Sequence, residues 1–95
     1  PRRPNRESIP LLEALENVLS FLHVQLRDIQ VFLNVDRSIN VFFDRNHLRQ
    51  IFINILINSI DALGQTQNPR IEIEASAAAS QVKLEISDNG PGMDP

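Results

Sequence analysis

The 95-residue sequence contains no cysteine, no tryptophan and no tyrosine, and it has only three glycines and one lysine. The lack of cysteine excludes disulfide frameworks, cysteine-based zinc sites and thiol nucleophiles, and it is typical of a reducing compartment. No apolar run approaches the roughly 20 residues that a membrane-spanning helix needs. The N-terminal segment also lacks the apolar core of a signal peptide. The sequence therefore predicts a soluble segment without disulfides.

Charge and length restrict the possible classes further. Nine basic residues oppose twelve acidic ones, the net charge is −3, and eight of the nine bases are arginine. This balance does not suit a module that binds polyphosphate backbones by bulk charge, so we expect no nucleic-acid partner. A chain of 95 residues forms one small domain at most, which excludes a two-domain enzyme. Because it begins with Pro1 and ends with Asp94-Pro95, we interpret it as a piece of a longer protein.

The first half of the sequence predicts a linker, a helix and two strands. Residues 1–10 contain three arginines and three prolines, a composition that predicts a linker from a preceding domain. Apolar residues at helical spacing predict an amphipathic helix over residues 11–26. Alternating, largely β-branched residues predict a strand over residues 29–35, and the bulky run of residues 40–43 predicts a second strand paired with it.

The second half predicts a long helix followed by a hairpin. We expect Asp44 to cap a helix that continues to Leu63 and is stopped by Gly64. Residues 70–76 and 81–87 alternate between apolar and polar side chains, which predicts two paired strands. The order of the elements favours an α+β fold, a two-layer α/β sandwich with the helices on one face of the sheet.

The predicted long helix carries one polar stripe. At 100° per residue, four polar side chains fall within about 80° of one another, and most of the remaining surface is apolar. These side chains are Gln50, Asn54, Asn58 and Asp61. We therefore expect the helix to be buried on several sides, with the stripe facing either solvent or a cavity. Solvent faces usually carry lysine and glutamate, and an amide oxygen is a hard, neutral ligand for Mg²⁺, so the composition favours a magnesium and phosphate site.

A second candidate functional segment follows the last predicted strand. It reads Ser87-Asp88-Asn89-Gly90-Pro91-Gly92-Met93. Strand parity places Asp88 on the same side as Leu84 and Ile86, toward the helix layer. Two interpretations stay open. Asp88 either caps the backbone of a strand-ending turn, or it accepts a hydrogen bond from a ligand amine while Gly90 and Gly92 allow the backbone to approach closely.

Together the two segments resemble the GHKL superfamily of ATP-binding domains, which contains sensor histidine kinases, gyrase, heat-shock chaperones and MutL-type repair proteins. The polar helix residues resemble its N box, and the run from Asp88 to Gly92 resembles its G1 box, with 30 residues separating Asn58 from Asp88. The resemblance covers about residues 11–95. It implies the Bergerat fold with a mixed sheet, incomplete at the C-terminus because the second glycine-rich box and the ATP lid are missing.

Details of the resemblance favour the histidine-kinase branch. The ATP-hydrolysing branches typically carry a glutamate one turn before the metal-binding asparagine, where this sequence has Asn54. Asp44 and Gln50 match the kinase pattern, and the N-terminal segment is similar to the linker that leaves the dimerisation and phosphoacceptor domain of such kinases. The resemblance thus implies the ATP-binding catalytic domain of a two-component sensor histidine kinase, which is an ATP-dependent phosphotransferase.

The resemblance also implies roles for single residues of the helix. Asn58 would bind the Mg²⁺ that bridges the ATP phosphates, and Asn54 would act beside it in the phosphate environment. Asp61 would bind a metal-linked water or face solvent. The phosphoryl group would pass to a histidine in the dimerisation domain of the same protein, which makes the parent a homodimer, and a response regulator is the expected partner.

For the G1-like turn, the resemblance implies recognition of adenine. Asp88 would accept a hydrogen bond from the adenine amino group, while Gly90 and Gly92 would shape the pocket and the start of the lid. The expected location is the cytoplasm, including the cytoplasmic part of a membrane-bound sensor. By itself, the fragment is expected to be inactive.

Two alternatives stay open at this stage. A MutL- or gyrase-like ATPase also carries a run similar to Asn58-Ser59-Ile60-Asp61-Ala62-Leu63, although Asn54 in place of glutamate counts against it. A non-catalytic interaction domain of the same fold is the other alternative, and the intact Asn58 and Asp88 count against it. A nucleotide-binding assay would distinguish it from a kinase.

Overall fold

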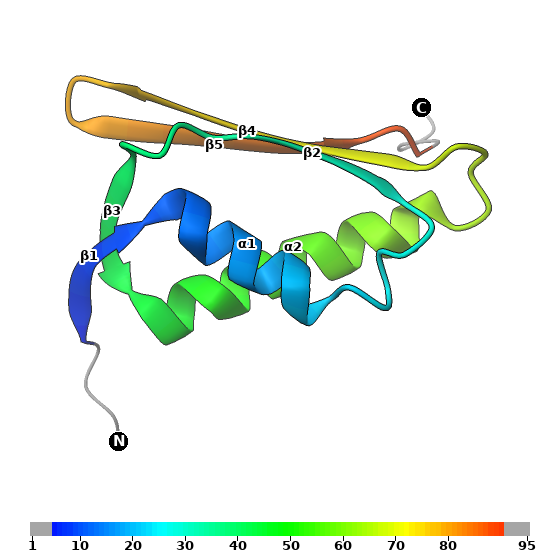
Figure 1. The fold of residues 1–95 in the computed structure, drawn as a ribbon, viewed down its shortest axis with the longest axis horizontal. Coiled ribbons are helices and arrows are strands. Elements are labelled where there is room, and N and C mark those ends of the chain that lie inside the picture. Colours follow the sequence, from blue (N-terminus) through cyan, green and yellow to red (C-terminus); the bar gives the residue numbers. More distant parts are fainter. Residues whose placement is uncertain (1–4, 91–95) are drawn as a thin grey trace.

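Two helices lie under one face of a three-stranded sheet, and a two-stranded sheet closes one end of the molecule (Figure 1). The structure, a computed structural model, describes residues 5–90. Along the chain these residues form β1 (Arg6–Pro10), α1 (Leu11–Phe21), β2 (Gln30–Asn34), β3 (Asn40–Asp44), α2 (Arg45–Leu63), β4 (Arg70–Ala78) and β5 (Gln81–Asp88). This arrangement confirms the predicted two-layer α+β fold with the helices on one face of the sheet.

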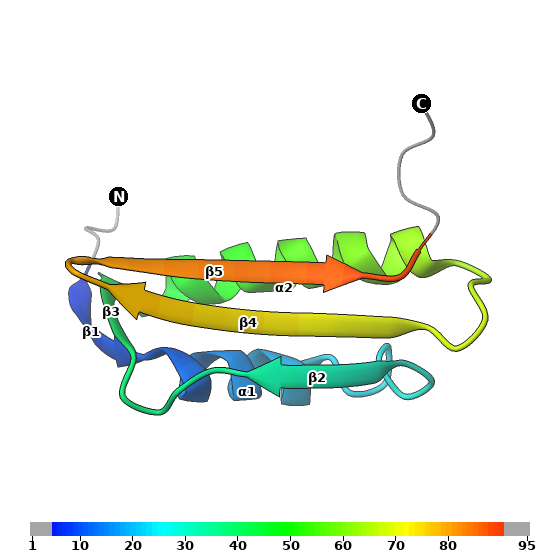
Figure 2. The same ribbon diagram turned by 90° about the horizontal axis from the view of Figure 1, so that it is seen from above.

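The larger sheet has the strand order β2-β4-β5 and contains both strand orientations (Figure 2). β2 runs parallel to β4, with Gln30 opposite Arg70 and Asn34 opposite Glu74. β4 and β5 form the predicted antiparallel hairpin. Parallel neighbours need a long crossover connection, which β3 and α2 supply here. The sheet is therefore mixed, as predicted.

The smaller sheet pairs the segment before α1 with the segment before α2. β1 and β3 are antiparallel, and Ile9 lies opposite Val41. Two predictions are therefore wrong: residues 6–10 form a strand, and residues 40–43 pair with β1 instead of β2. The reason is the burial of Ile9, because a backbone that enters the core needs paired N–H and C=O groups. Residues 1–4 lie outside the described residues, and a preceding domain stays a prediction.

α1 ends at Phe21, whereas the sequence predicts a helix over residues 11–26. Beyond Phe21 the backbone forms turns, in which several N–H groups bond to the carbonyl three residues earlier instead of four. Leu22 and Leu26 keep the helical spacing and stay buried. The apolar periodicity therefore predicts the burial of these residues correctly. It does not predict the helix, because consecutive turns can bury residues at the same spacing.

α2 has the predicted bounds because both of its ends carry strong signals. At the N-cap, Asp44 accepts hydrogen bonds from the backbone N–H groups of Asn5 at 2.7 Å and His47 at 2.9 Å. These bonds, led by the one from Asn5, lower the pKa of the Asp44 carboxyl below its ordinary value of 3.8. At the other end, Gly64 has a φ of 43° and a ψ of −111°, a backbone conformation that glycine adopts without strain.

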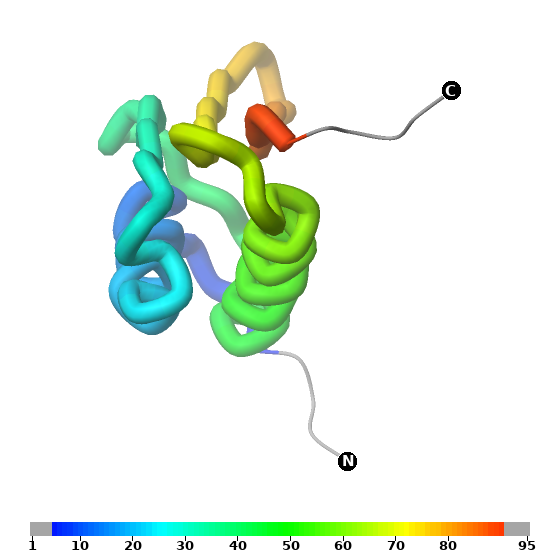
Figure 3. Tube along the Cα trace, turned by 90° about the vertical axis from the view of Figure 1, so that its right-hand side faces the viewer, coloured from blue at the N-terminus to red at the C-terminus, as the bar shows by residue number. Residues whose placement is uncertain are grey.

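The prediction that α2 is buried on several sides is confirmed in part within residues 5–90, because half-buried side chains on both flanks of the helix pack against the core, namely Ile51, Ile53, Ile57 and Ile60. A single stripe of the helix is buried, and it consists of Leu48, Phe52, Leu56, Ser59 and Leu63. This stripe faces α1 and the sheet, which Figure 3 shows above and beside the helix. Ile55 is 37% exposed, because neither of these neighbours covers its side of the helix. The opposite face of α2 is therefore open to a ligand or a partner.

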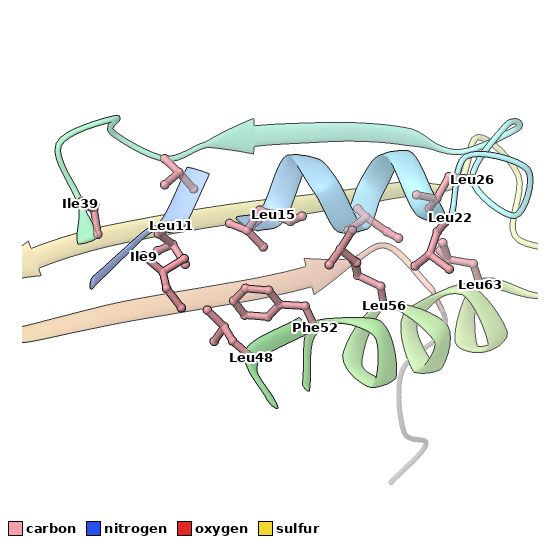
Figure 4. Packing of buried hydrophobic residues seen from close by; sticks show 14 residues of the cluster. Ile9, Leu11, Leu15, Leu22, Leu26, Ile39, Leu48, Phe52, Leu56 and Leu63 are labelled. Carbon is pink, nitrogen blue, oxygen red and sulfur yellow. The ribbon is translucent and has the colours of Figure 1, made fainter. Parts of the chain in front are cut away.

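The core fills the space between the two helices and the sheet (Figure 4). Its most deeply buried side chains include Leu15 from α1, Leu56 from α2, and Ile71 and Ile73 from β4, all with 0% exposure. Burying each such side chain contributes about 1.5–3 kcal/mol. The core thus fixes α2 against β4, which sets the position of the residues at the end of the helix. Within residues 5–90, no helix is both long and apolar enough to cross a bilayer.

Candidate functional site

The predicted polar stripe lies on the open side of α2. Gln50, Asn54, Asn58 and Asp61 are all exposed, whereas the buried stripe of the helix faces the other way. The Gln50 Nε2 atom donates a hydrogen bond to Asn54 Oδ1 at 3.1 Å, which holds these two amides together one turn apart. The stripe is thus a continuous row of polar side chains that a ligand can reach.

Asp88 lies at the end of β5, on the side of the sheet that faces the helices. Its register partner across the hairpin is Ile71, which is fully buried on that side, so the parity argument from the sequence is confirmed. The Asp88 side chain itself is exposed. Its Oδ1 atom accepts a hydrogen bond from the Gly90 N–H at 2.9 Å. The turn-capping interpretation is therefore correct, and it leaves Oδ2 available as an acceptor for a ligand amine.

Gly90 brings the two predicted segments together. A Cβ atom at this position would lie 2.9 Å from the carbonyl oxygen of Ala62 and 3.0 Å from Asp88 Oδ1. The first contact is with backbone, which cannot move aside, so only glycine fits. Ala62 lies one helical turn after Asn58, and the turn that follows β5 is therefore seated directly on the last part of α2.

Asn89 is a residue that the sequence analysis does not single out. Its Oδ1 atom accepts a hydrogen bond from the Arg70 N–H at 2.7 Å, and its Nδ2 atom donates one to the Asn68 carbonyl oxygen at 2.9 Å. Its own backbone N–H donates to the Arg70 carbonyl oxygen at 3.2 Å. The asparagine therefore joins the turn to the connection between α2 and β4. Only its place inside the Asp-Asn-Gly run could have drawn attention to it.

A shallow hollow of about 500 Å³ lies where the end of α2 meets the turn after β5. Its lining residues are Ala62, Leu63, Gly64, Gln65, Thr66 and Asn89. A somewhat larger hollow, of about 580 Å³, lies at the far end of the hairpin and contains none of the predicted site residues. The first hollow is the more relevant of the two, because Asn89 and Ala62 place it beside both predicted segments.

The donors present fit a nucleotide with a magnesium ion. Among residues 5–90, no group of three or more His, Asp or Glu side chains could hold a metal. Mg²⁺ commonly takes one or two protein ligands and completes its shell with substrate phosphates and water. The exposed amide oxygen of Asn58 suits that role. Gly92 lies outside the described residues.

Curated relatives with this sequence pattern are sensor proteins. The chain is 36% identical over 50 residues to the C4-dicarboxylate transport sensor protein DctB of Rhizobium meliloti, which covers 53% of this chain and 8% of that protein. It is 34% identical over 91 residues to DctB of Pseudomonas aeruginosa, which covers 92% of this chain and 15% of that protein. The chain therefore spans less than one sixth of the length of either relative.

Solved structures with the same fold are histidine kinase catalytic domains. The catalytic domain of histidine kinase ThkA superposes with a TM-score of 0.85 at 22% identity, covering 95% of this chain and 62% of that chain. ThkA in complex with the response regulator protein TrrA gives a TM-score of 0.82 at 24% identity, covering 94% of this chain and 27% of that chain. These matches show a common fold.

Residues 43–95, more than half of the chain, match the family described as histidine kinase-, DNA gyrase B-, and HSP90-like ATPase. The match begins just before α2 and includes both the amide stripe and the turn seated on it. The fold of the solved kinase domains agrees with this assignment. The chain belongs to the family of histidine kinase-, DNA gyrase B- and HSP90-like ATPases.

Proposed function

We propose that this chain is the nucleotide-binding part of a sensor histidine kinase, which binds Mg-ATP for transfer of the γ-phosphoryl group to a histidine in another domain. The observation that supports the proposal is the close fit of Gly90 against the Ala62 carbonyl, because it holds the turn that carries the Asp88 carboxylate against the same end of α2 as Asn58. One end of the site then suits a base with an amino group, and the other suits phosphates. Adenosine triphosphate has both.

The adenine end of the site consists of the turn after β5. Asp88 would accept a hydrogen bond from the adenine amino group through Oδ2, since Oδ1 is already held by the Gly90 N–H. That bond also fixes the orientation of the carboxylate before a ligand arrives, which lowers the cost of binding. Because Gly90 has no side chain, the turn can sit against the Ala62 carbonyl, and this would hold the backbone of the turn in place beside the base. We assign Gly92 to the same pocket.

The phosphate end of the site consists of the amide stripe on α2. Asn58 would hold Mg²⁺ through its amide oxygen, and the ion, when bound, supplies charge neutralisation to the phosphates. Asn54, oriented by Gln50, would donate its amide hydrogens toward the phosphates and their water shell. We assign Asp61 to a metal-linked water. Phosphoryl transfer needs mainly this kind of positioning and charge stabilisation, and little covalent chemistry from the protein.

The identity of Asn54 supports a kinase over a MutL- or gyrase-like ATPase. Hydrolysis of ATP needs a group that accepts a proton from the attacking water, and a carboxylate does this. The Asn54 amide has no basic site of that kind, and its oxygen already accepts a hydrogen bond from Gln50. Without a base at this position, the bound nucleotide would be protected from water and kept for a protein acceptor.

The expected partners follow from this chemistry. The acceptor would be a histidine in the dimerisation domain of the same protein, which would make the parent a homodimer. A response regulator would then receive the phosphoryl group, and ThkA, which shares this fold, has been solved in complex with the response regulator TrrA. The cytoplasm, which contains ATP and response regulators, is the proposed location.

The nucleotide assignment is tested by Asp88→Asn in the full-length protein. The substitution keeps the size of the side chain but leaves a single acceptor oxygen, so the side chain can no longer accept from both the Gly90 N–H and the adenine amino group. We expect calorimetric titration to show a loss of ATP affinity of roughly 100-fold. Asp28→Asn, the same exchange at an exposed aspartate on the turns after α1, is the control. Wild-type affinity in Asp88→Asn would reject the adenine assignment. A wild-type protein that binds no nucleotide would favour the interaction-domain alternative.

A further inference from the structure

Asn89 makes three hydrogen bonds to a segment that lies about 20 residues earlier in the sequence. Its side chain accepts from the Arg70 N–H at 2.7 Å and donates to the Asn68 carbonyl oxygen at 2.9 Å. Its backbone N–H donates to the Arg70 carbonyl oxygen at 3.2 Å. The side chain thus uses one acceptor and one donor on the two residues that flank Pro69. The backbone N–H continues the ladder between β4 and β5 past its last paired residues, Ile71 and Asp88.

The segment that receives these bonds is itself held in a restricted conformation. Asn68 has a φ of 51°, which places it in the left-handed region that residues other than glycine seldom adopt. In that conformation, its carbonyl oxygen faces Asn89 and accepts the hydrogen bond from Nδ2. On the other side, the Pro69 carbonyl accepts a hydrogen bond from the Gln30 N–H of β2 at 3.0 Å. The connection between α2 and β4 is therefore a fixed support.

The two neighbours of Asn89 are the residues that meet the nucleotide in the proposed function. Asp88 presents the acceptor carboxylate, and Gly90 is seated on Ala62 with no space for a side chain. A rotation of the peptide units around Asn89 would move the carboxylate and the glycine together. A small displacement of a recognition group is enough to remove most of its selectivity, because hydrogen bonds to charged groups depend steeply on distance and angle.

We propose that Asn89 is a positioning residue that determines specificity for the amino group of adenine. By joining the turn to Asn68 and Arg70, it holds the Asp88 carboxylate in the orientation that distinguishes a base with an exocyclic amine from one with a carbonyl. The inference rests on the proposed nucleotide-binding function. It adds that selectivity for the base depends on a side chain that does not itself meet the base.

The test compares two nucleotides in the full-length protein. Inosine triphosphate has a carbonyl where ATP has the amino group, so it cannot donate to Asp88. We expect the wild-type protein to bind Mg-ATP roughly 100-fold more tightly than Mg-inosine triphosphate in calorimetric titrations. In Asn89→Ala, this ratio should fall to roughly tenfold or less, because affinity for ATP is lost while the already weak affinity for inosine triphosphate changes little.

A ratio of two affinities separates positioning from folding. A variant that merely unfolds a fraction of the protein lowers the apparent number of sites for both nucleotides and leaves the ratio unchanged. Asn89→Asp gives a second measurement, since it keeps the acceptor for the Arg70 N–H but sets a carboxylate oxygen against the Asn68 carbonyl. We expect its ratio to fall as in the alanine variant. Asn34→Ala, at an exposed strand end on β2, is the control and should keep the wild-type ratio.

The outcomes distinguish this inference from the proposed function. If the wild-type protein binds neither nucleotide, the proposed function fails and the inference fails with it. If the wild-type protein prefers ATP and both Asn89 variants keep that preference, only the positioning role is overturned. A lower ratio in both variants together with wild-type values in Asn34→Ala would support the role.

Discussion

The two ends of α2 differ in how their polar side chains are used. At the N-terminal end, the charged residues have protein partners: Asp44 caps the helix, and Arg45 reaches Glu7 at 3.4 Å and Glu13 at 3.9 Å. The guanidinium carbon of Arg49 lies 4.5 Å from the centre of the Phe21 ring. At the C-terminal end, Asn58 and Asp61 are exposed, and neither makes a side-chain hydrogen bond or ion pair within residues 5–90.

This difference separates residues that hold the fold from residues that are free to bind. Polar groups at the first end join α2 to β1 and α1, and their interactions are already satisfied inside the protein. At the second end the backbone is fixed, through the core and through Gly90, while the polar side chains remain open. This combination suits a binding site. A rigid backbone reduces the entropy lost on binding, and the polar side chains without protein partners can bond to a ligand.

The largest effect is expected for Gly90→Ala, which disrupts the packing of the turn after β5 against the C-terminal end of α2. The new Cβ would lie 2.9 Å from the Ala62 carbonyl oxygen and would force the turn away from α2. We expect ATP affinity to fall by at least roughly 100-fold in calorimetric titration.

Gly64→Ala is the matched control at the same end of the helix. It strains the cap, where φ is 43°, and should lower the stability by about 1–2 kcal/mol while the folded protein still binds ATP. Equal affinities for the two alanine variants would contradict the seating role of Gly90.

Asn58→Ala should separate function from stability. Removal of the amide should lower the autophosphorylation rate of the full-length protein by roughly 100-fold, because a charge-stabilising ligand is lost. The same change replaces a poor helix former with the best one, so urea unfolding should show a gain of about 0.5 kcal/mol. Asn17→Ala, at an exposed position of α1, should give the gain in stability and leave the autophosphorylation rate unchanged. Lost stability in Asn58→Ala would place the residue among those that hold the fold.

Asp44→Ala should act only at the other end, and its effect should depend on pH. The folded-state pKa of Asp44 is lowered, so its stabilising contribution is present above the ordinary value of 3.8 and disappears as the pH falls through the folded pKa. Near neutral pH the variant should melt below the wild type, and the two melting temperatures should converge at more acidic pH. A gap that stays constant as the pH is lowered through the acidic range to the limit of the folded protein would show that the charge is not responsible.

The smallest effect is expected for Arg45→Ala. Both of its carboxylate partners are solvent-exposed to a large extent, so the two ion pairs together should contribute about 0.5 kcal/mol, and less in high salt. ATP affinity should stay at the wild-type value. A change in affinity after this substitution would mean that the first end of the helix also contributes to binding.

Much of the fold could be predicted from the sequence wherever local signals decide it. The bounds of α2 follow from Asp44 and Gly64, and the hairpin follows from alternation alone. The pairing partners of the strands in the first half could not be predicted. β2 and β3 are close in sequence, so a local pair between the two was the simplest expectation, whereas β3 pairs with β1 and β2 pairs with β4. The long-range burial of Ile9 decides that question, and no pattern within a short window reports it.

The candidate site shows the same division. Residue chemistry and helical periodicity indicate Asn58 as a ligand, and strand parity indicates the direction of Asp88, which the register confirms. The role of Asn89 depends on the backbone of Asn68 and Arg70 lying within hydrogen-bond distance, which only the folded chain brings about. The side chains proposed to meet the ligand are thus indicated by sequence patterns, whereas the contacts of Asn89 are not.

The length of α2 has a mechanical consequence. With 19 residues at 1.5 Å each, the helix is a rod about 28 Å long. β1 is attached at its start through Asp44, whose carboxylate binds the Asn5 N–H, and the turn after β5 is seated near its finish. A pull or twist applied to β1 would therefore reach the turn after β5 along a single stiff element.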